Sequence, residues 1–160
     1  PIPMKKVMFI ISLVSLTSVA MAQTSQEEID MVQAIFGMEK KAFVTEFMQL
    51  EANQSDAFWR LYYEYEAKRK DLGKERIQLL EKFANNYPNL DEATTESLLK
   101  GMMDLQSQND KLIASYAKQI KKEIGVSTAA QFYQIEGYIL SKIRTEILEN
   151  IPVIEEAERM

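Results

Sequence analysis

Two long amphipathic segments, separated by one short break, constrain the fold of this chain more than any other feature. Residues 53–86 and 91–123 each carry apolar side chains at helical spacing, and the break is Asn86-Tyr87-Pro88-Asn89. Folding the second segment back on the first, with Leu72 opposite Leu105, forms an antiparallel hairpin. The same register gives two further apolar pairs, Tyr65 with Leu112 and Leu79 with Leu98. We therefore predict a long helical hairpin.

The composition favours an all-α fold and excludes several classes of site. The chain has 160 residues, enough for one domain, and only five glycines and four prolines to interrupt helices. It has no cysteine and no histidine, which excludes disulfides, thiol nucleophiles, Ser-His-Asp triads and the usual zinc and copper sites. Its formal net charge is −5, and no concentrated basic face is present for nucleic acid. We expect no cofactor, no metal ion and no nucleic-acid partner.

The first 22 residues have the organisation of a secretory signal peptide. Lys5-Lys6 form a basic start, Val7 to Leu16 form an apolar run, and Ala20-Met21-Ala22 form a small-residue cleavage site. A membrane anchor would need about 20 apolar residues, and serine and threonine side chains interrupt this run earlier. We predict that residues 1–22 are removed and that the mature protein is secreted from the cytoplasm.

Two further helices complete a single all-α domain over residues 23–152. The first covers residues 27–48, where Gly37 and Lys40-Lys41 interrupt the apolar spacing and indicate a bent or loosely docked element. The other carries an inward face of isoleucines and Phe132, and it ends near residue 150 because a proline follows shortly after. The expected total is four helices and no strand.

The ends of the helices are marked by residues that can satisfy free backbone groups. Those we assign as N-caps are Asn53 or Ser55, then Asp91, then Thr128 in a capping box with Gln131. Gly125 is a typical end signal for the third helix. Beyond the fourth helix, residues 153–160 are acidic, and we predict a flexible tail there.

Three segments resemble the Spy/CpxP-like family of periplasmic proteins, which carry LTxxQ motifs. They are Leu50-x-x-x-Gln54 followed by Ala57-Phe58-Trp59-Arg60-Leu61-Tyr62-x-Glu64-Tyr65, then Leu90-Asp91-Glu92-Ala93, and Gln131-Phe132-Tyr133-Gln134-Ile135-Glu136. The resemblance covers most of the mature chain, roughly from Glu46 to Val153. It departs from the family pattern at Glu51, where the first motif has threonine, and at Thr94, where the second often has glutamine.

This resemblance implies a four-helix, curved, cradle-like homodimer in the periplasm. Proteins of the family bind partly unfolded clients without ATP, or report envelope stress to a membrane sensor or a sigma-factor system. Those properties follow from the resemblance and not from the periodicity of the sequence.

Surface residues of the hairpin are candidates for partner binding. Trp59 and Tyr63 lie together on one helix face, which indicates contact with another helix, with a second subunit or with a ligand. The basic cluster around Lys68-Arg69-Lys70 is either a solvated face or a strip that attracts acidic or amphipathic clients. Met102 fits ordinary core packing, whereas Met103 lies off the apolar stripe. The candidate client or partner surface comprises Trp59, Tyr63, Lys68, Arg69, Lys70, Arg76 and Met103.

The residue pattern favours a binding protein over an enzyme. No pair of carboxylates is set off by apolar neighbours that would raise a pKa, and no nucleophile has an evident base. We expect a periplasmic, ATP-independent, chaperone-like protein that binds unfolded or partly folded envelope proteins. The alternative is a regulatory sensor subunit, which docks on a membrane partner controlling a sigma factor or a two-component response.

Overall fold

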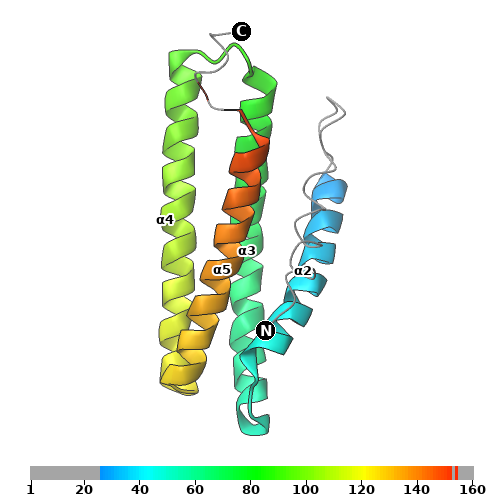
Figure 1. The fold of residues 1–160 in the computed structure, drawn as a ribbon, viewed down its shortest axis with the longest axis vertical. Helices are drawn as coiled ribbons and strands as arrows, with labels where there is room; N and C mark the ends of the chain where they lie inside the picture. Colours follow the sequence, from blue (N-terminus) through cyan, green and yellow to red (C-terminus); the bar gives the residue numbers. More distant parts are fainter. Residues whose placement is uncertain (1–25, 153, 155–160) are drawn as a thin grey trace.

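The computed structural model describes residues 26–152 and Ile154, and this part of the chain forms an elongated bundle of four α-helices without strands (Figure 1). Side chains are described from Phe36 onward. The helices are α2 (Gln26–Met48), α3 (Ala52–Asn86), α4 (Glu92–Glu123) and α5 (Val126–Asn150). The predicted all-α fold is confirmed, with boundaries within a few residues of those expected. The predicted signal peptide and all of the acidic tail except Ile154 lie outside the described residues.

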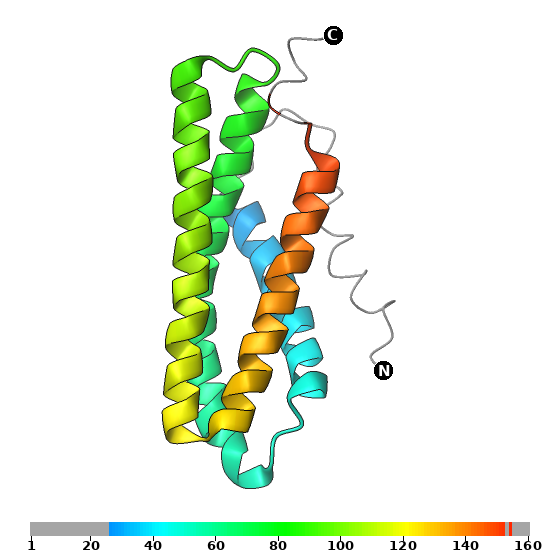
Figure 2. The ribbon, with the colours of Figure 1, turned by 60° about the vertical axis from the view of Figure 1, so that its left-hand side comes forward.

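The predicted hairpin is the frame of the molecule. Helices α3 and α4 run antiparallel along its length, α5 packs on α4, and α2 packs on both α3 and α5 (Figure 1). Figure 2 shows the bundle from another side. Helix α5 starts next to the end of α4 and diverges from α4 toward its own C-terminal end. Among the described residues, none of the helices combines the length and apolar character that a membrane crossing requires.

Two contacts across the hairpin join residues within about one helical turn of the pairs that we predicted. The ring of Tyr65 packs edge-on against Tyr116, with centroids 5.6 Å apart, one turn further along α4 than the predicted partner Leu112. Leu79 also lies against Gly101, one turn beyond Leu98, so close that a Cβ at Gly101 would be 2.5 Å from a Leu79 methyl carbon. Side chains three and four residues apart on one helix are neighbours, so a side chain of the facing helix can contact both.

Two of the assigned caps differ in the structure. Asp91 does cap α4, because its Oδ1 accepts the backbone N–H of Thr94 at 2.7 Å, and Gly125 follows α4 with φ 148°. Helix α5 begins immediately after Gly125, so Thr128 is buried within its first turns and the predicted capping box is wrong. Similarly, the N-cap of α3 is Glu51 rather than Asn53 or Ser55, and the Glu51 backbone N–H donates to Gln54 Oε1 at 3.2 Å.

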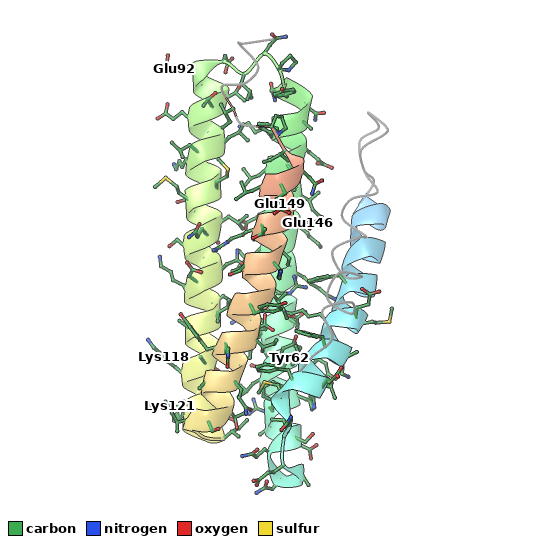
Figure 3. All side chains as sticks on the ribbon, in the orientation of Figure 1. Tyr62, Glu92, Lys118, Lys121, Glu146 and Glu149 are labelled. Carbon is green, nitrogen blue, oxygen red and sulfur yellow. The ribbon has the colours of Figure 1, made fainter. Side chains whose placement is uncertain are left out.

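The best-buried core, which we call the aromatic core, lies at the end of the bundle where α4 turns into α5. It joins residues of all four helices: Phe43, Val44, Met48, Phe58, Leu61, Tyr62, Tyr65, Ile113, Tyr116, Ile120, Ala129, Phe132 and Ile135. Tyr62 marks the level at which α2 and α5 cover α3 (Figure 3). The C-terminal half of α2 is therefore firmly packed, unlike the loosely docked helix we considered, whereas its N-terminal part stands apart from α3 (Figure 1).

Candidate functional site

A buried ion network joins three helices beside the aromatic core. Lys40 of α2 has only 1% of its surface exposed, and its Nζ donates to Glu136 Oε2 of α5 at 2.8 Å. The same ammonium forms an ion pair with Glu66 of α3. One lysine thus links α2 to both neighbouring helices.

Polar and aromatic side chains complete the environment of this lysine. Arg69 Nε donates to Glu66 Oε1 at 2.9 Å, and the Tyr65 hydroxyl donates to Glu136 Oε2 at 2.6 Å. Lys40 Nζ lies 5.5 and 5.1 Å from the ring centroids of Tyr62 and Tyr65. Burial raises the pKa of Tyr65, and the negative Glu136 raises it further. Burial would also raise the pKa of Glu66, but Lys40 and Arg69 outweigh it and lower that pKa.

This network corrects the role that we gave to Lys40 from the sequence. Lys40, read there as a break in an apolar stripe, is part of the core, and Glu136 is a buried carboxylate that accepts hydrogen bonds from Lys40 and Tyr65. Both partners of Lys40 are distant in the chain, so no local pattern identifies them. One signal was present. Lys40 and Glu136 occupy positions in phase with the apolar stripes of their helices, and they carry opposite charges.

The geometry of the network suits a structural role better than catalysis. The cavity beside it has a volume of about 40 Å³, which admits water-sized molecules but no organic substrate. A buried ion pair is weak evidence for net stability, yet removing one partner leaves an uncompensated charge. We therefore regard Lys40 as the group that fixes α2 to the rest of the bundle.

A much larger opening, the apolar groove, lies near the opposite end of the bundle. Its volume is about 430 Å³, and it forms between α3, α4 and the C-terminal end of α5, where α5 leans away in Figure 2. The lining is mainly apolar and comprises Leu79, Leu80, Phe83, Leu98, Met102, Leu105, Ile147, Leu148, Ile151, Pro152 and Ile154, together with Arg76, Gln106 and Arg144. This size lies within the range of about 300–1,000 Å³ that is usual for small-ligand sites.

Two arginines of the apolar groove are poorly matched by negative charge. Arg144 Nη2 lies 3.6 Å from Asp110 Oδ1 and is buried without a hydrogen bond in the described part of the chain. Arg76 makes no hydrogen bond or ion pair with any described residue. Burial lowers its pKa, and the positive charges of Arg144 and Arg69 lower it further.

The aromatic residues predicted for the partner surface, Trp59 and Tyr63, contact other side chains of the same chain. Trp59 is half-buried and contacts Phe58 and Tyr62 edge-on, with centroid distances of 5.2 and 5.3 Å. Tyr63 is exposed, and its hydroxyl accepts a hydrogen bond from Lys41, whose Nζ also lies over both the Trp59 and Tyr63 rings. The contacts of Trp59 are thus within the chain, which is one of the alternatives considered.

The basic cluster divides between different surroundings. Lys68 is exposed, with its Nζ 5.3 Å from the Tyr116 ring centroid, and Lys70 is also exposed. Arg69 belongs to the ion network and Arg76 lines the apolar groove, although both also line the small cavity beside the network. The predicted basic strip is therefore not a single surface.

Met102 is exposed, contrary to our assignment of this side chain to the core. Its exposed fraction is 44%, and that of Met103 is 65%. Leu98 and Leu105 are buried as expected, but Met102 stands on the wall of the open apolar groove between α4 and the C-terminal end of α5. Leu99, three and four residues before these methionines, is exposed as well.

Within the described residues, no cluster of three or more acidic side chains is arranged to hold a metal ion. Comparison of the chain with models of known protein families, with curated proteins and with solved structures gave no significant match. The resemblance to Spy/CpxP-like proteins therefore stays a prediction based on the sequence segments that carry it.

Proposed function

We propose that this protein is a non-catalytic, ATP-independent client-binding protein of the cell envelope, of the Spy/CpxP-like type. Its client surface, which we call the methionine surface, comprises Leu99, Met102 and Met103. The observation that carries the proposal is the exposure of all three large apolar side chains within about one turn of α4. Such grouping is a feature of protein-binding surfaces, whereas single exposed apolar residues are common everywhere.

The position of these residues supports binding to irregular apolar segments. Residues three and four apart share one side of a helix, so Leu99, Met102 and Met103 are neighbours. Methionine side chains are flexible and adapt to different partners. Charged side chains lie on the same helix between and beside them, at Lys100 and Asp104. A shallow surface of this kind releases its clients readily, because it buries little of them.

The proposal is tested by suppression of aggregation of a chemically denatured model protein. The triple variant L99S/M102S/M103S should lose most of the suppression shown by the natural chain. Met38→Ser is the matched control, because Met38 is an equally exposed methionine, at 67%, on α2. Equal suppression by the natural chain and the triple variant would contradict the proposal.

The sensor alternative predicts a different result in the same experiments. Stoichiometric, saturable binding to one membrane protein, with no effect on aggregation, would favour a regulatory subunit over a client-binding protein.

We also propose that the protein is a homodimer, which follows from the family resemblance. Sedimentation equilibrium of the natural chain and the triple variant tests this. A monomer in both would contradict the dimer. A dimer that dissociates only in the triple variant would show that the methionine surface is the subunit interface and not a client surface.

A further inference from the structure

The apolar groove contains more positive charge than its surroundings neutralise. Arg76 and Arg144 both line it, one from α3 and the other from α5. Arg69, the third guanidinium nearby, has Glu66 as a close partner, and Arg144 has Asp110 at 3.6 Å. Arg76 has no carboxylate partner among the described residues. A guanidinium that is largely removed from water is normally paired, so its partner is expected to come from elsewhere.

The other residues that line the apolar groove indicate which kind of anion it can bind. Apart from the two arginines, Gln106 is the one polar side chain in the described lining. An extended peptide inserted here would leave backbone N–H and C=O groups without hydrogen bonds, which is costly. An aliphatic chain has no such groups. The volume of about 430 Å³ is at the low end of the small-ligand range and favours one chain over a two-chain lipid.

We propose that the apolar groove binds a medium-chain fatty acid, with its carboxylate between Arg76 and Arg144 and its aliphatic chain along the leucine and isoleucine side chains. Arginine is suited to this role because its planar donors match the two oxygens of a carboxylate. The proposal goes beyond client binding and does not depend on it. Met102 belongs to both surfaces, which places the ligand beside the client surface.

The experiment measures binding of dodecanoate, below its micellar concentration, to the full chain by isothermal titration calorimetry. Arg76→Gln and Arg144→Gln should each weaken dodecanoate binding by about tenfold or more, since a hydrogen bond to a charged group is lost. Dodecanol, which lacks the carboxylate, should bind the natural chain and both variants equally. Arg60→Gln is the matched control, because Arg60 is an exposed α3 arginine paired with Glu64 and Glu123.

Two further measurements use the same proteins. Decanoate, shorter by two methylene groups, should bind the natural chain about tenfold more weakly than dodecanoate. Without ligand, R76Q should melt at the same or a higher temperature than the natural chain, because it removes a buried charge without a partner. A large decrease in that melting temperature would reveal an internal partner of Arg76 and overturn the proposal.

Other occupants of the groove give other results. Absence of dodecanoate binding, or equal binding of dodecanoate and dodecanol, would overturn the proposal. The proposal would also be overturned if dodecanoate bound only after residues 155–160 were deleted. The acidic C-terminal segment would then be the partner of Arg76. A peptide of leucines and one glutamate that binds in an Arg76-dependent way, where dodecanoate does not, would assign the groove to polypeptides.

Discussion

The two ends of the hairpin use the same three helices, α3, α4 and α5, but bury their apolar side chains to different degrees. At the end with the aromatic core, Phe58, Tyr62 and Phe132 are almost inaccessible. At the end with the apolar groove, Leu79 and Phe83 are only half-buried. Helix α2 packs on the first end, and α5 leans away at the second (Figures 1 and 2).

The difference shows that an amphipathic stripe does not by itself become a core. Each end has enough apolar side chains to bury, but burial requires a further helix in position to cover them. At the aromatic core this helix is α2, and Lys40 attaches it through Glu66 and Glu136. Near the hairpin loop, no described helix takes this place, so apolar surface stays available for binding.

The largest effect is expected at the lysine that attaches α2. Lys40→Ala leaves Glu66 and Glu136 without their shared cation and should lower the free energy of unfolding by about 3–5 kcal/mol. Urea denaturation measures this change. Lys41→Ala, at the exposed neighbouring position, should cost less than about 1 kcal/mol. A similarly small loss of stability in both variants would show that Lys40 does not attach α2 to the bundle. The different burial of the two ends would then need another explanation.

Truncation of one phenylalanine at each end compares the two cores directly. Phe132→Ala should destabilise the protein by about 3–5 kcal/mol, because Phe132 is fully enclosed. Phe83→Ala, in the lining of the apolar groove, should cost roughly 1–2 kcal/mol, since the side chain is half-buried. Equal losses in denaturant titrations would mean that the groove is as well packed as the aromatic core.

Two neighbouring tyrosines separate hydrogen bonding from packing within the aromatic core. Tyr65→Phe removes a hydrogen bond to the Glu136 carboxylate and should cost about 1.5–3 kcal/mol. Tyr62→Phe should be neutral or slightly stabilising, because the buried Tyr62 hydroxyl has no partner among the described residues. Both values come from the same chemical denaturation experiment. A larger loss of stability for Tyr62→Phe than for Tyr65→Phe would contradict this assignment of hydrogen bonds.

The smallest effect is a dependence of stability on acid pH. The folded-state pKa of Glu66 is lowered from its ordinary value of 4.5, so ionised Glu66 stabilises the fold fully above that pH. This contribution is lost as pH falls below 4.5 toward the folded-state pKa. Unfolding midpoints measured between pH 7 and pH 3 should therefore decrease at the acid end. Glu66→Gln should be less stable at pH 7 and show a smaller acid decrease than the natural chain.

The helices, and much of their boundaries, could be predicted because they depend on local chemistry. Asp91 caps α4 and Gly125 follows it, as their side-chain types require. Thr128 failed as a cap because Gly125 allows a turn so tight that α5 starts before it. The prediction that Met102 is a core residue was wrong. Sequence spacing predicts which face of a helix is apolar, but not whether another helix packs on that face.

The candidate sites depend on residues that are distant in the chain. Arg76 and Arg69 are close in sequence and look alike, yet one lines the apolar groove and the other pairs with Glu66. Lys40 meets Glu136 across 96 positions of the chain. No spacing rule relates these pairs, because their contacts arise only when α2 and α5 dock on the hairpin.

The sequence by itself determined four helices, a hairpin and the polarity of each helix face, since hydrogen bonding within helices and the periodicity of apolar side chains act over a few residues. The tertiary structure alone decided which faces are covered, which charges are paired and where an apolar groove remains. The physical reason is that burial and ion pairing depend on the angles at which helices cross, and one helix does not encode those angles.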